Sequence, residues 1–131
     1  KGVPVVGFQT EELPAFYTRK SGFKVDYKVD TEESLAKALK AKWDLGLEGG
    51  VVVANPIPEQ FEMDYDTINN AINAAVKEAD EKGIVGKEST PFLLAKVKEI
   101  TGGSSLESNI QLVFNNAKVG ARLAVELSKL N

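Results

Sequence analysis

Hydrophobic and polar positions form a series of segments that predict strands followed by helices. A β-branched run over Val3–Phe8 predicts a strand that leads into a loop over Gln9–Gly22. The segment Phe23–Val29 alternates apolar and charged residues, as a half-exposed edge strand does. Val51–Ala54 is apolar without alternation, which is typical of a strand buried on both faces of a parallel sheet. We therefore expect three strands, the last ended by the two prolines of Asn55-Pro56-Ile57-Pro58.

Four other segments carry apolar residues at helical spacing. The first follows a capping sequence at Asp30–Glu33 and ends before Gly46. The second is capped by Asp64 and ends before Gly83. The residues predicted to be buried are Leu35, Leu39 and Trp43 in the first helix, and Ile68, Ile72, Ala75, Val76 and Ala79 in the second.

The third and fourth helices are predicted after residue 89. Thr90 and Pro91 have the residue types of an N-cap and a first helical position, and this helix turns Leu93, Leu94, Val97 and Ile100 inward. After Gly102-Gly103, Ser104 and Glu107 have the spacing of a capping box that opens a helix over about 105–130. The order β, β, α, β, α, α, α predicts an α/β fold. Because so few strands hardly make a sheet, we expect residues 1–131 to be one incomplete part of a larger domain, with the other strands upstream.

Composition narrows the possible functions. The chain has 131 residues, 43% of them hydrophobic, and its 16 basic and 19 acidic residues give a net charge of -3. Since no basic stripe is present, a nucleic-acid polymer is not an expected partner. The absence of Cys and His excludes thiolate or imidazole chemistry, so a reaction here has to use carboxylates, lysines or amides. The apolar runs are too short to cross a membrane, and we expect a cytoplasmic protein.

Two loops follow strands at the edge where ligands gather in open α/β sheets, over residues 9–22 and 55–58. Asn55 either presents its amide to a ligand or bonds its own backbone at the strand end. Arg19 and Lys20 are equally suited to a phosphate or a neighbouring subunit. The carboxylates at Glu59, Glu62, Asp64 and Asp66 are better explained by helix starts than by a metal.

The last helix has a polar side and an apolar side. Asn109 and Asn116, seven residues apart, project beside the apolar side, whereas Asn115 points toward the polar side. Inward amides need partners, which are either backbone groups of a neighbouring loop or a heterocycle with a matching amide edge, such as uracil. The polar side comprises Glu107, Gln111, Lys118, Arg122, Glu126 and Lys129; the apolar side comprises Leu106, Ile110, Val113, Ala117, Ala121 and Ala124.

Four motifs together resemble the C-terminal portion of the pseudouridine 5'-phosphate glycosidase family, in the family's order and over nearly the whole chain. They are Gly7-Phe8-x-Thr10-x-x-x-Pro14-Ala15-Phe16-Tyr17-x-x-x-Ser21-Gly22, Asn55-Pro56-Ile57-Pro58, Thr90-Pro91-Phe92-Leu93-Leu94, and Thr101-Gly102-Gly103-x-Ser105-Leu106-x-x-Asn109-Ile110 with Asn115-Asn116-Ala117.

The resemblance implies a homotrimeric enzyme with an α/β/α sandwich around a mixed sheet. It implies reversible cleavage of the C-glycosidic bond of pseudouridine 5'-phosphate to uracil and ribose 5-phosphate, with a divalent metal, usually manganese. The family's reactive lysine, acidic residue and metal-binding aspartate match no position here, so we assign no catalytic or metal residue to this chain. Asn109 is the implied uracil contact, and we add Asn116 and Asn55 as substrate-binding candidates. The alternative is a noncatalytic interaction or regulatory module on the same scaffold.

Overall fold

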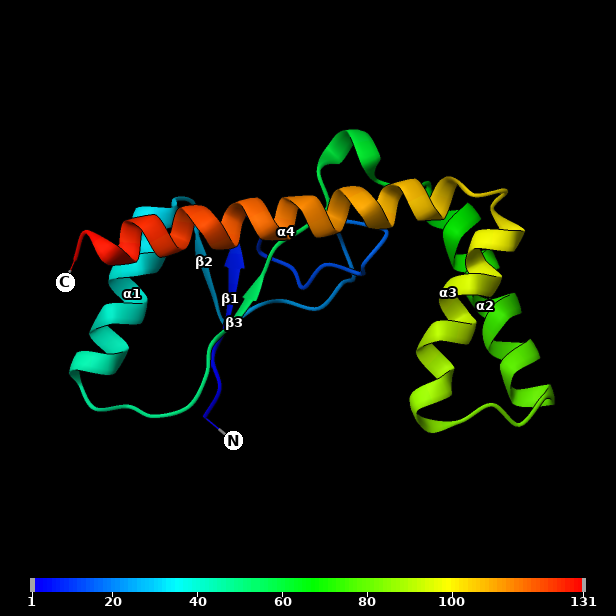
Figure 1. The fold of residues 1–131 in the computed structure, drawn as a ribbon, viewed down its shortest axis with the longest axis horizontal. Coiled ribbons are helices and arrows are strands. Elements are labelled where there is room, and N and C mark those ends of the chain that lie inside the picture. The colour runs from blue at the N-terminus through cyan, green and yellow to red at the C-terminus, as the bar shows by residue number, and fades with distance from the viewer. Residues whose placement is uncertain (1, 131) are drawn as a thin grey trace.

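The structure is a computed structural model and describes residues 2–130. Its strands are β1 (Val5–Phe8), β2 (Tyr27–Val29) and β3 (Val52–Ala54), and they form one sheet in the order β2-β1-β3 (Figure 1). Both pairings are parallel, with Val6 opposite Tyr27 on one side and Val53 on the other. The α/β fold class is confirmed, and β2 is the edge strand that its alternating sequence predicted.

Four helices and two short 3-10 turns complete the fold. The helices are α1 (Glu32–Asp44), α2 (Tyr65–Glu81), α3 (Ser89–Ile100) and α4 (Ser104–Ser128); the turns span Glu59–Phe61 and Gly86–Glu88. Helix α4 extends across the sheet, packs against α1 near its C-terminal end, and continues to the α2–α3 hairpin (Figure 1). The sheet region and the α2–α3 hairpin are therefore joined by the long helix and by the loop after β1, whose Tyr17 packs in the hairpin core.

Each region has its own hydrophobic core. Between the sheet, α1 and α4, the core consists of Val6, Phe8, Leu35 and Val119. Between α2, α3 and the loop after β1, it consists of Tyr17, Ile68, Ala71, Ala75 and Val97. Leu35 and Ala75 are fully buried, as their positions on the predicted helical stripes require.

Two strand predictions are corrected. The segment Phe23–Val29 pairs as a strand only over its last three residues, and Phe23 is 73% exposed because the rest belongs to the loop. Within Val51–Ala54, a parallel strand does form over Val52–Ala54, but it is not buried on both faces. Since β3 ends the described sheet, Val52 is 47% exposed.

The helix ends and faces also need correction. Thr31 rather than Asp30 caps α1, accepting from the Ser34 N–H. Helix α3 begins at Ser89, so Thr90 and Pro91 lie inside its first turn, and Gly103 rather than a Ser104 box precedes α4. Three residues predicted inward are at least 40% exposed because they lie beyond the packed stripe: Trp43, Val76 and Ile100. The Asp64 cap is confirmed, since its carboxylate accepts from the Thr67 N–H at 2.9 Å.

Candidate functional site

The loop after β1 is held in a strained conformation at the carboxyl edge of the sheet. Gln9 and Phe16 have φ angles of 57° and 65°, in the left-handed region that residues with a side chain rarely adopt. Gln9 is fixed there because its backbone N–H donates to the Val29 carbonyl at 2.7 Å and its side-chain amide donates to the backbone carbonyl of Asp30. Such strain persists only where surrounding contacts enforce it, and it is concentrated at functional sites.

Gly7 permits this loop to fold back on the strand. A Cβ at this position would lie 2.1 Å from the Thr10 carbonyl oxygen and 2.9 Å from a Val25 methyl group. Only glycine therefore fits where the Gly7-Phe8-x-Thr10 motif leaves the sheet.

Asparagines of α4 fasten the second loop, which follows β3. The Asn55 amide nitrogen donates to the side-chain oxygen of Asn116 at 2.9 Å, and the Asn115 amide donates to the Pro56 carbonyl at 3.2 Å. This amide–amide pair between Asn55 and Asn116 is a contact that the sequence did not suggest, and it leaves the prediction of a ligand contact for both residues as a prediction. Asn115, which was predicted to point toward the polar side of the helix, is instead half-buried and bonded to the loop.

Asn55 lies between two hollows at this edge of the sheet. An apolar groove of about 550 Å³ runs along β3 beneath α4, with Phe16, Val53, Leu112 and Asn116 in its lining. A smaller polar hollow of about 220 Å³ contains Gln9, Arg19, Asn115 and Arg122. Asn55 lines both. We take the groove, the polar hollow and the amide pair between them as the candidate site.

Charged groups of the polar hollow already have partners in the chain. Arg19 donates from its guanidinium to the Ile57 carbonyl at 2.6 Å, and its backbone N–H donates to the Glu62 carboxylate. Arg122 lies 3.7 Å from the Glu32 carboxylate. Arg19 thus fixes the loop over 55–58, a third role that the sequence did not suggest.

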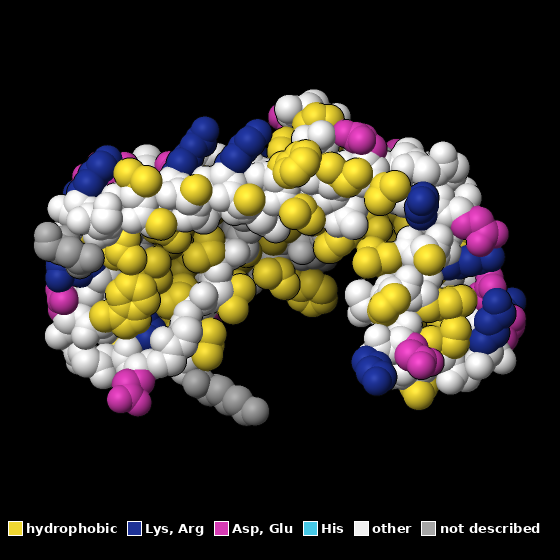
Figure 2. Space-filling model, viewed as in Figure 1, with side chains coloured by type: hydrophobic (Ala, Val, Ile, Leu, Met, Phe, Trp, Pro, Cys, Tyr) yellow, Lys and Arg dark blue, Asp and Glu magenta, His cyan; other side chains and the backbone are white. Residues whose placement is uncertain are grey.

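The apolar side of α4 is exposed rather than buried. The helix instead packs on this chain through Ser105, Ser108, Leu112 and Val119. Val113 and Phe114 are 57% and 55% exposed, and Figure 2 shows hydrophobic side chains along the viewer's side of the helix below a rim of basic ones. The division into two sides was predicted correctly, but the prediction that the apolar side packs inward is wrong for the described residues.

Asn109 is half-buried and forms no side-chain hydrogen bond within residues 2–130. Seven residues separate it from Asn116, so both lie on the same side of α4, and of the two Asn116 lines the apolar groove. The structure thus brings Asn55 and Asn116 into contact and places Asn109 two turns further along the same side.

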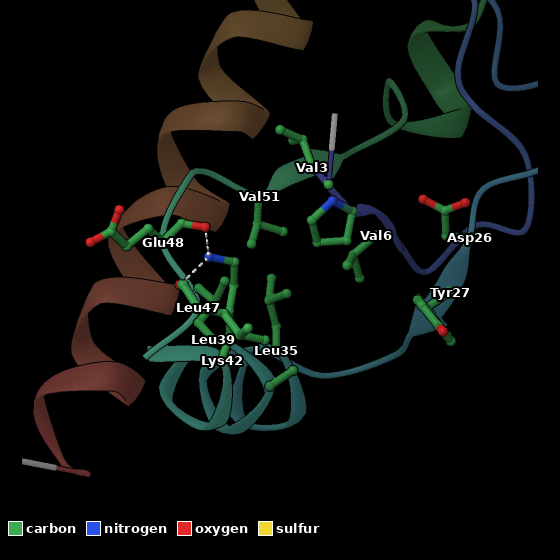
Figure 3. A pocket seen from close by; sticks show the side chains of 13 residues that line it. Val3, Val6, Asp26, Tyr27, Leu35, Leu39, Lys42, Leu47, Glu48 and Val51 are labelled. Atoms are coloured by element: carbon green, nitrogen blue, oxygen red, sulfur yellow. Dashed lines mark hydrogen bonds between the residues drawn. The ribbon is translucent and has the colours of Figure 1, made fainter. Parts of the chain in front are cut away.

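Another cavity, of about 630 Å³, lies at the opposite, amino end of the strands (Figure 3). Aliphatic side chains such as Val3, Leu39 and Val51 line it. Its one lysine, Lys42, is engaged with the carbonyl oxygens of Leu47, Glu48 and Gly49 at 2.7, 2.9 and 2.8 Å. Of its two acidic residues, Asp26 and Glu48, the first is engaged as well, since its carboxylate accepts from the Val5 N–H at 2.9 Å.

Two of the four clustered carboxylates, Glu62 and Asp64, accept hydrogen bonds from the backbone of the chain. Two hydrogen bonds from Thr67 lower the pKa of Asp64, as expected for a helix cap. Burial raises the pKa of Tyr17 in the α2–α3 core, an effect that the neighbouring Ser105 hydroxyl partly opposes. Within residues 2–130, no three acidic, His or Cys side chains come together as metal ligands, and no helix is long and apolar enough to span a bilayer.

A family model described as "Indigoidine synthase A like protein" matches residues 1–126. The chain belongs to this indigoidine synthase A-like family. An indigoidine synthase A-like protein from Thermotoga maritima superposes with a TM-score of 0.77 at 32% identity, covering 98% of this chain and 41% of that one. Another solved structure of similar fold is the prealnumycin C-glycosynthase AlnA in complex with ribulose 5-phosphate. It superposes with a TM-score of 0.86 at 31% identity, and the match covers 98% of this chain and 42% of the AlnA chain.

Curated relatives of this indigoidine synthase A-like chain carry the name pseudouridine-5'-phosphate glycosidase. The one from Clostridium botulinum is 78% identical over 131 residues, which is all of this chain and 43% of the relative. The one from Escherichia coli is 57% identical over 129 residues, 98% of this chain and 41% of the relative. The four motifs indicated a resemblance to this glycosidase family, and these relatives confirm it. The chain spans about two fifths of the length of these relatives.

Proposed function

We propose that this chain is the C-terminal part of a pseudouridine 5'-phosphate glycosidase, which reversibly cleaves the C-glycosidic bond to give uracil and ribose 5-phosphate. Relatives at 57–78% identity that bear this name support the proposal. The likeness to a C-glycosynthase in complex with ribulose 5-phosphate agrees with it, because that protein also handles a C-glycoside and binds a pentulose phosphate. As part of the proposal, the complete enzyme is cytoplasmic and trimeric.

The assignment of the uracil contact rests on the pair of side-chain amides formed by Asn55 and Asn116. The hydrogen bond from Asn55 to Asn116 uses one N–H of Asn55 and the oxygen of Asn116. It leaves the Asn55 oxygen as an acceptor and the Asn116 amide nitrogen as a donor. Uracil presents an N–H beside a carbonyl oxygen, which is the complementary pattern. The apolar groove next to the pair offers a surface for the flat ring.

Asn109 belongs to the same proposed contact. Its amide lies on the groove side of α4 and is unbonded within residues 2–130, so it is available to a ligand. A bound base would replace solvent at this half-buried amide and hydrogen-bond with it.

The remaining chemistry is assigned to the part of the relatives that this chain does not match. The described residues do not fit a divalent metal such as manganese, since they offer no cluster of acidic ligands. The lysine that forms an imine with the opened ribose is likewise placed outside residues 1–131. This chain then contributes the base-binding side of the pocket and no bond-breaking group.

The proposal can be tested with a fusion in which this chain replaces the matching 43% of the Clostridium botulinum relative. We expect the fusion to release uracil from pseudouridine 5'-phosphate and the 131-residue chain alone to release none. Asn109→Ala and Asn116→Ala should each lower kcat/KM by roughly 10- to 100-fold, the effect of one unmade buried polar contact.

Asn70→Ala is the matched control, because Asn70 is an exposed asparagine on α2. A folded fusion without activity would favour the noncatalytic module instead. Unchanged kinetics in both Asn109→Ala and Asn116→Ala would remove these side chains from the base site.

A further inference from the structure

Phe16 lines the apolar groove in a backbone conformation that a bulky residue rarely adopts. Its φ angle is 65°, and the Tyr17 N–H donates to the Ala15 carbonyl at 2.8 Å, which closes a three-residue turn around it. Turns of this kind with a positive central φ are rare and strained, and glycine would adopt the conformation more easily. The chain therefore keeps an aromatic side chain at a position where the backbone disfavours one.

The ring of Phe16 is oriented by a buried neighbour and is still partly uncovered. It meets the ring of Tyr17 edge to face, with 4.8 Å between the centroids and 77° between the planes. Tyr17 is 5% exposed in the α2–α3 core, and its carbonyl accepts from the Met63 N–H at 3.0 Å, so its position is set by that core. Phe16 remains 44% exposed. An oriented, half-uncovered ring in a groove offers a surface to a flat ligand.

The same groove contains the pair of side-chain amides. Asn55 and Asn116 line it together with Phe16, although the three residues come from the loop after β3, from α4 and from the loop after β1. Hydrogen bonds are made at the edge of a base, whereas stacking uses its face. One bound base can therefore contact the amides and the aromatic ring at the same time.

We propose that Phe16 stacks on the uracil ring and makes the site selective for a flat, unsaturated base. The ligand in this proposal rests on the proposed function. Stacking on an aromatic side chain strengthens the binding of one base by roughly 5- to 150-fold. Hydrogen bonds alone do not give this selectivity, because 5,6-dihydrouracil presents the same N–H and carbonyl groups on a ring that is neither flat nor fully conjugated.

The test measures the affinity of the fusion with the Clostridium botulinum relative for uracil and for 5,6-dihydrouracil by equilibrium dialysis. We expect the unsubstituted fusion to bind uracil about 10-fold or more tighter than dihydrouracil. Phe16→Leu keeps an apolar side chain but removes the ring. It should reduce this ratio of affinities by about 5-fold or more, mainly because uracil binding weakens.

Three further variants separate stacking from other effects. Phe16→Tyr keeps the ring and should keep the ratio within about 2-fold of the unsubstituted fusion. Phe16→Met also removes the ring, and it replaces the leucine variant if circular dichroism shows that protein to be unfolded. Phe23→Leu is the matched control, because Phe23 belongs to the same loop, is 73% exposed and lines neither hollow. It should leave both affinities unchanged.

The kinetics of pseudouridine 5'-phosphate cleavage give an independent readout. A stacking contact is present in the bound substrate and in the transition state alike, so Phe16→Leu should raise KM more than it lowers kcat. A residue that only supports the fold would not produce this division together with a change in the preference for uracil over dihydrouracil.

An unchanged ratio in the folded leucine or methionine variant would overturn the proposal, as would an equal loss in Phe23→Leu or a folded fusion that binds no uracil. An unchanged ratio with a Tm lowered by more than about 5 °C would assign the ring to packing against the rest of the protein. Uracil release is measured on the same fusion. Selective binding that depends on Phe16 without release refutes the proposed function and leaves the stacking role standing, whereas release with an unchanged ratio does the reverse.

Discussion

Gly7→Ala adds one methyl group at the point where the site loop leaves β1. The new Cβ would lie 2.1 Å from the Thr10 carbonyl oxygen, whereas real Cβ contacts essentially never fall below 3.0 Å. The loop backbone therefore has to move by about 0.9 Å at the least, the difference between these two distances. It is not free to do so, since the hydrogen bond from Gln9 to Val29 holds one side and the Val25 methyl group blocks another.

The expected cost follows from this forced shift. Overpacking a well-fitted site costs about 1–3 kcal/mol, and a backbone collision belongs at the upper end. Gly120→Ala makes the same chemical change where nothing lies within 4 Å, inside helix α4. It should stabilise the protein by about 0.5–1 kcal/mol, because alanine is the better helix former. The two substitutions should therefore have opposite signs.

Urea unfolding followed by circular dichroism measures both changes. A Gly7→Ala protein within 0.5 kcal/mol of the wild type would refute the packing argument at Gly7. A destabilising Gly120→Ala in the 131-residue chain would show that the groove side of α4 is already filled.

Three further predictions concern hydrogen bonds and titration. The pKa of Tyr17 is raised in the folded protein, so the neutral phenol stabilises the fold fully below pH 10.0, and this stabilisation is lost as the pH rises through the folded pKa. Tyr17→Phe should therefore remove this alkaline loss of stability from the profile of Tm against pH. Asp64 has a lowered pKa, so its cap stabilises above pH 3.8 and fails as pH falls; the Tm difference between wild type and Asp64→Ala should close on acidification. A double-mutant cycle of Asn55→Ala and Asn116→Ala should give a coupling energy of about 0.5–1 kcal/mol, and purely additive losses would contradict the amide pair.

The sequence predicts the elements of this fold well because each depends on local patterns. The unbroken apolar run at Val51–Ala54 and the stripe at Leu35 and Leu39 locate a strand and a helix without tertiary information. The helix ends are less accurate, since Thr31 and Asp30 are both good caps and only the backbone angles decide between them.

The candidate site was predicted in part. Helical spacing placed Asn109 and Asn116 on one side of α4, but spacing cannot show that Asn116 meets Asn55 across 61 positions of sequence. Asn115 was missed because it appears on the polar side in projection, whereas it lies beside the face through which α4 packs on this chain, that of Ser108, Leu112 and Val119. Helical spacing distinguishes the two sides of a helix, but it does not show which side packs against the rest of the protein.

The three carbonyl contacts of Lys42 have a practical consequence for chemical labelling. The ammonium nitrogen lies within hydrogen-bond distance of three carbonyl oxygens of the turn that leads into β3, so it has to leave these contacts before it can react with an acylating reagent. Lys42 should therefore be modified far more slowly than lysines of the open helix surfaces. Its labelling rate then reports on whether the chain entering the third strand is properly folded, without any spectroscopic probe.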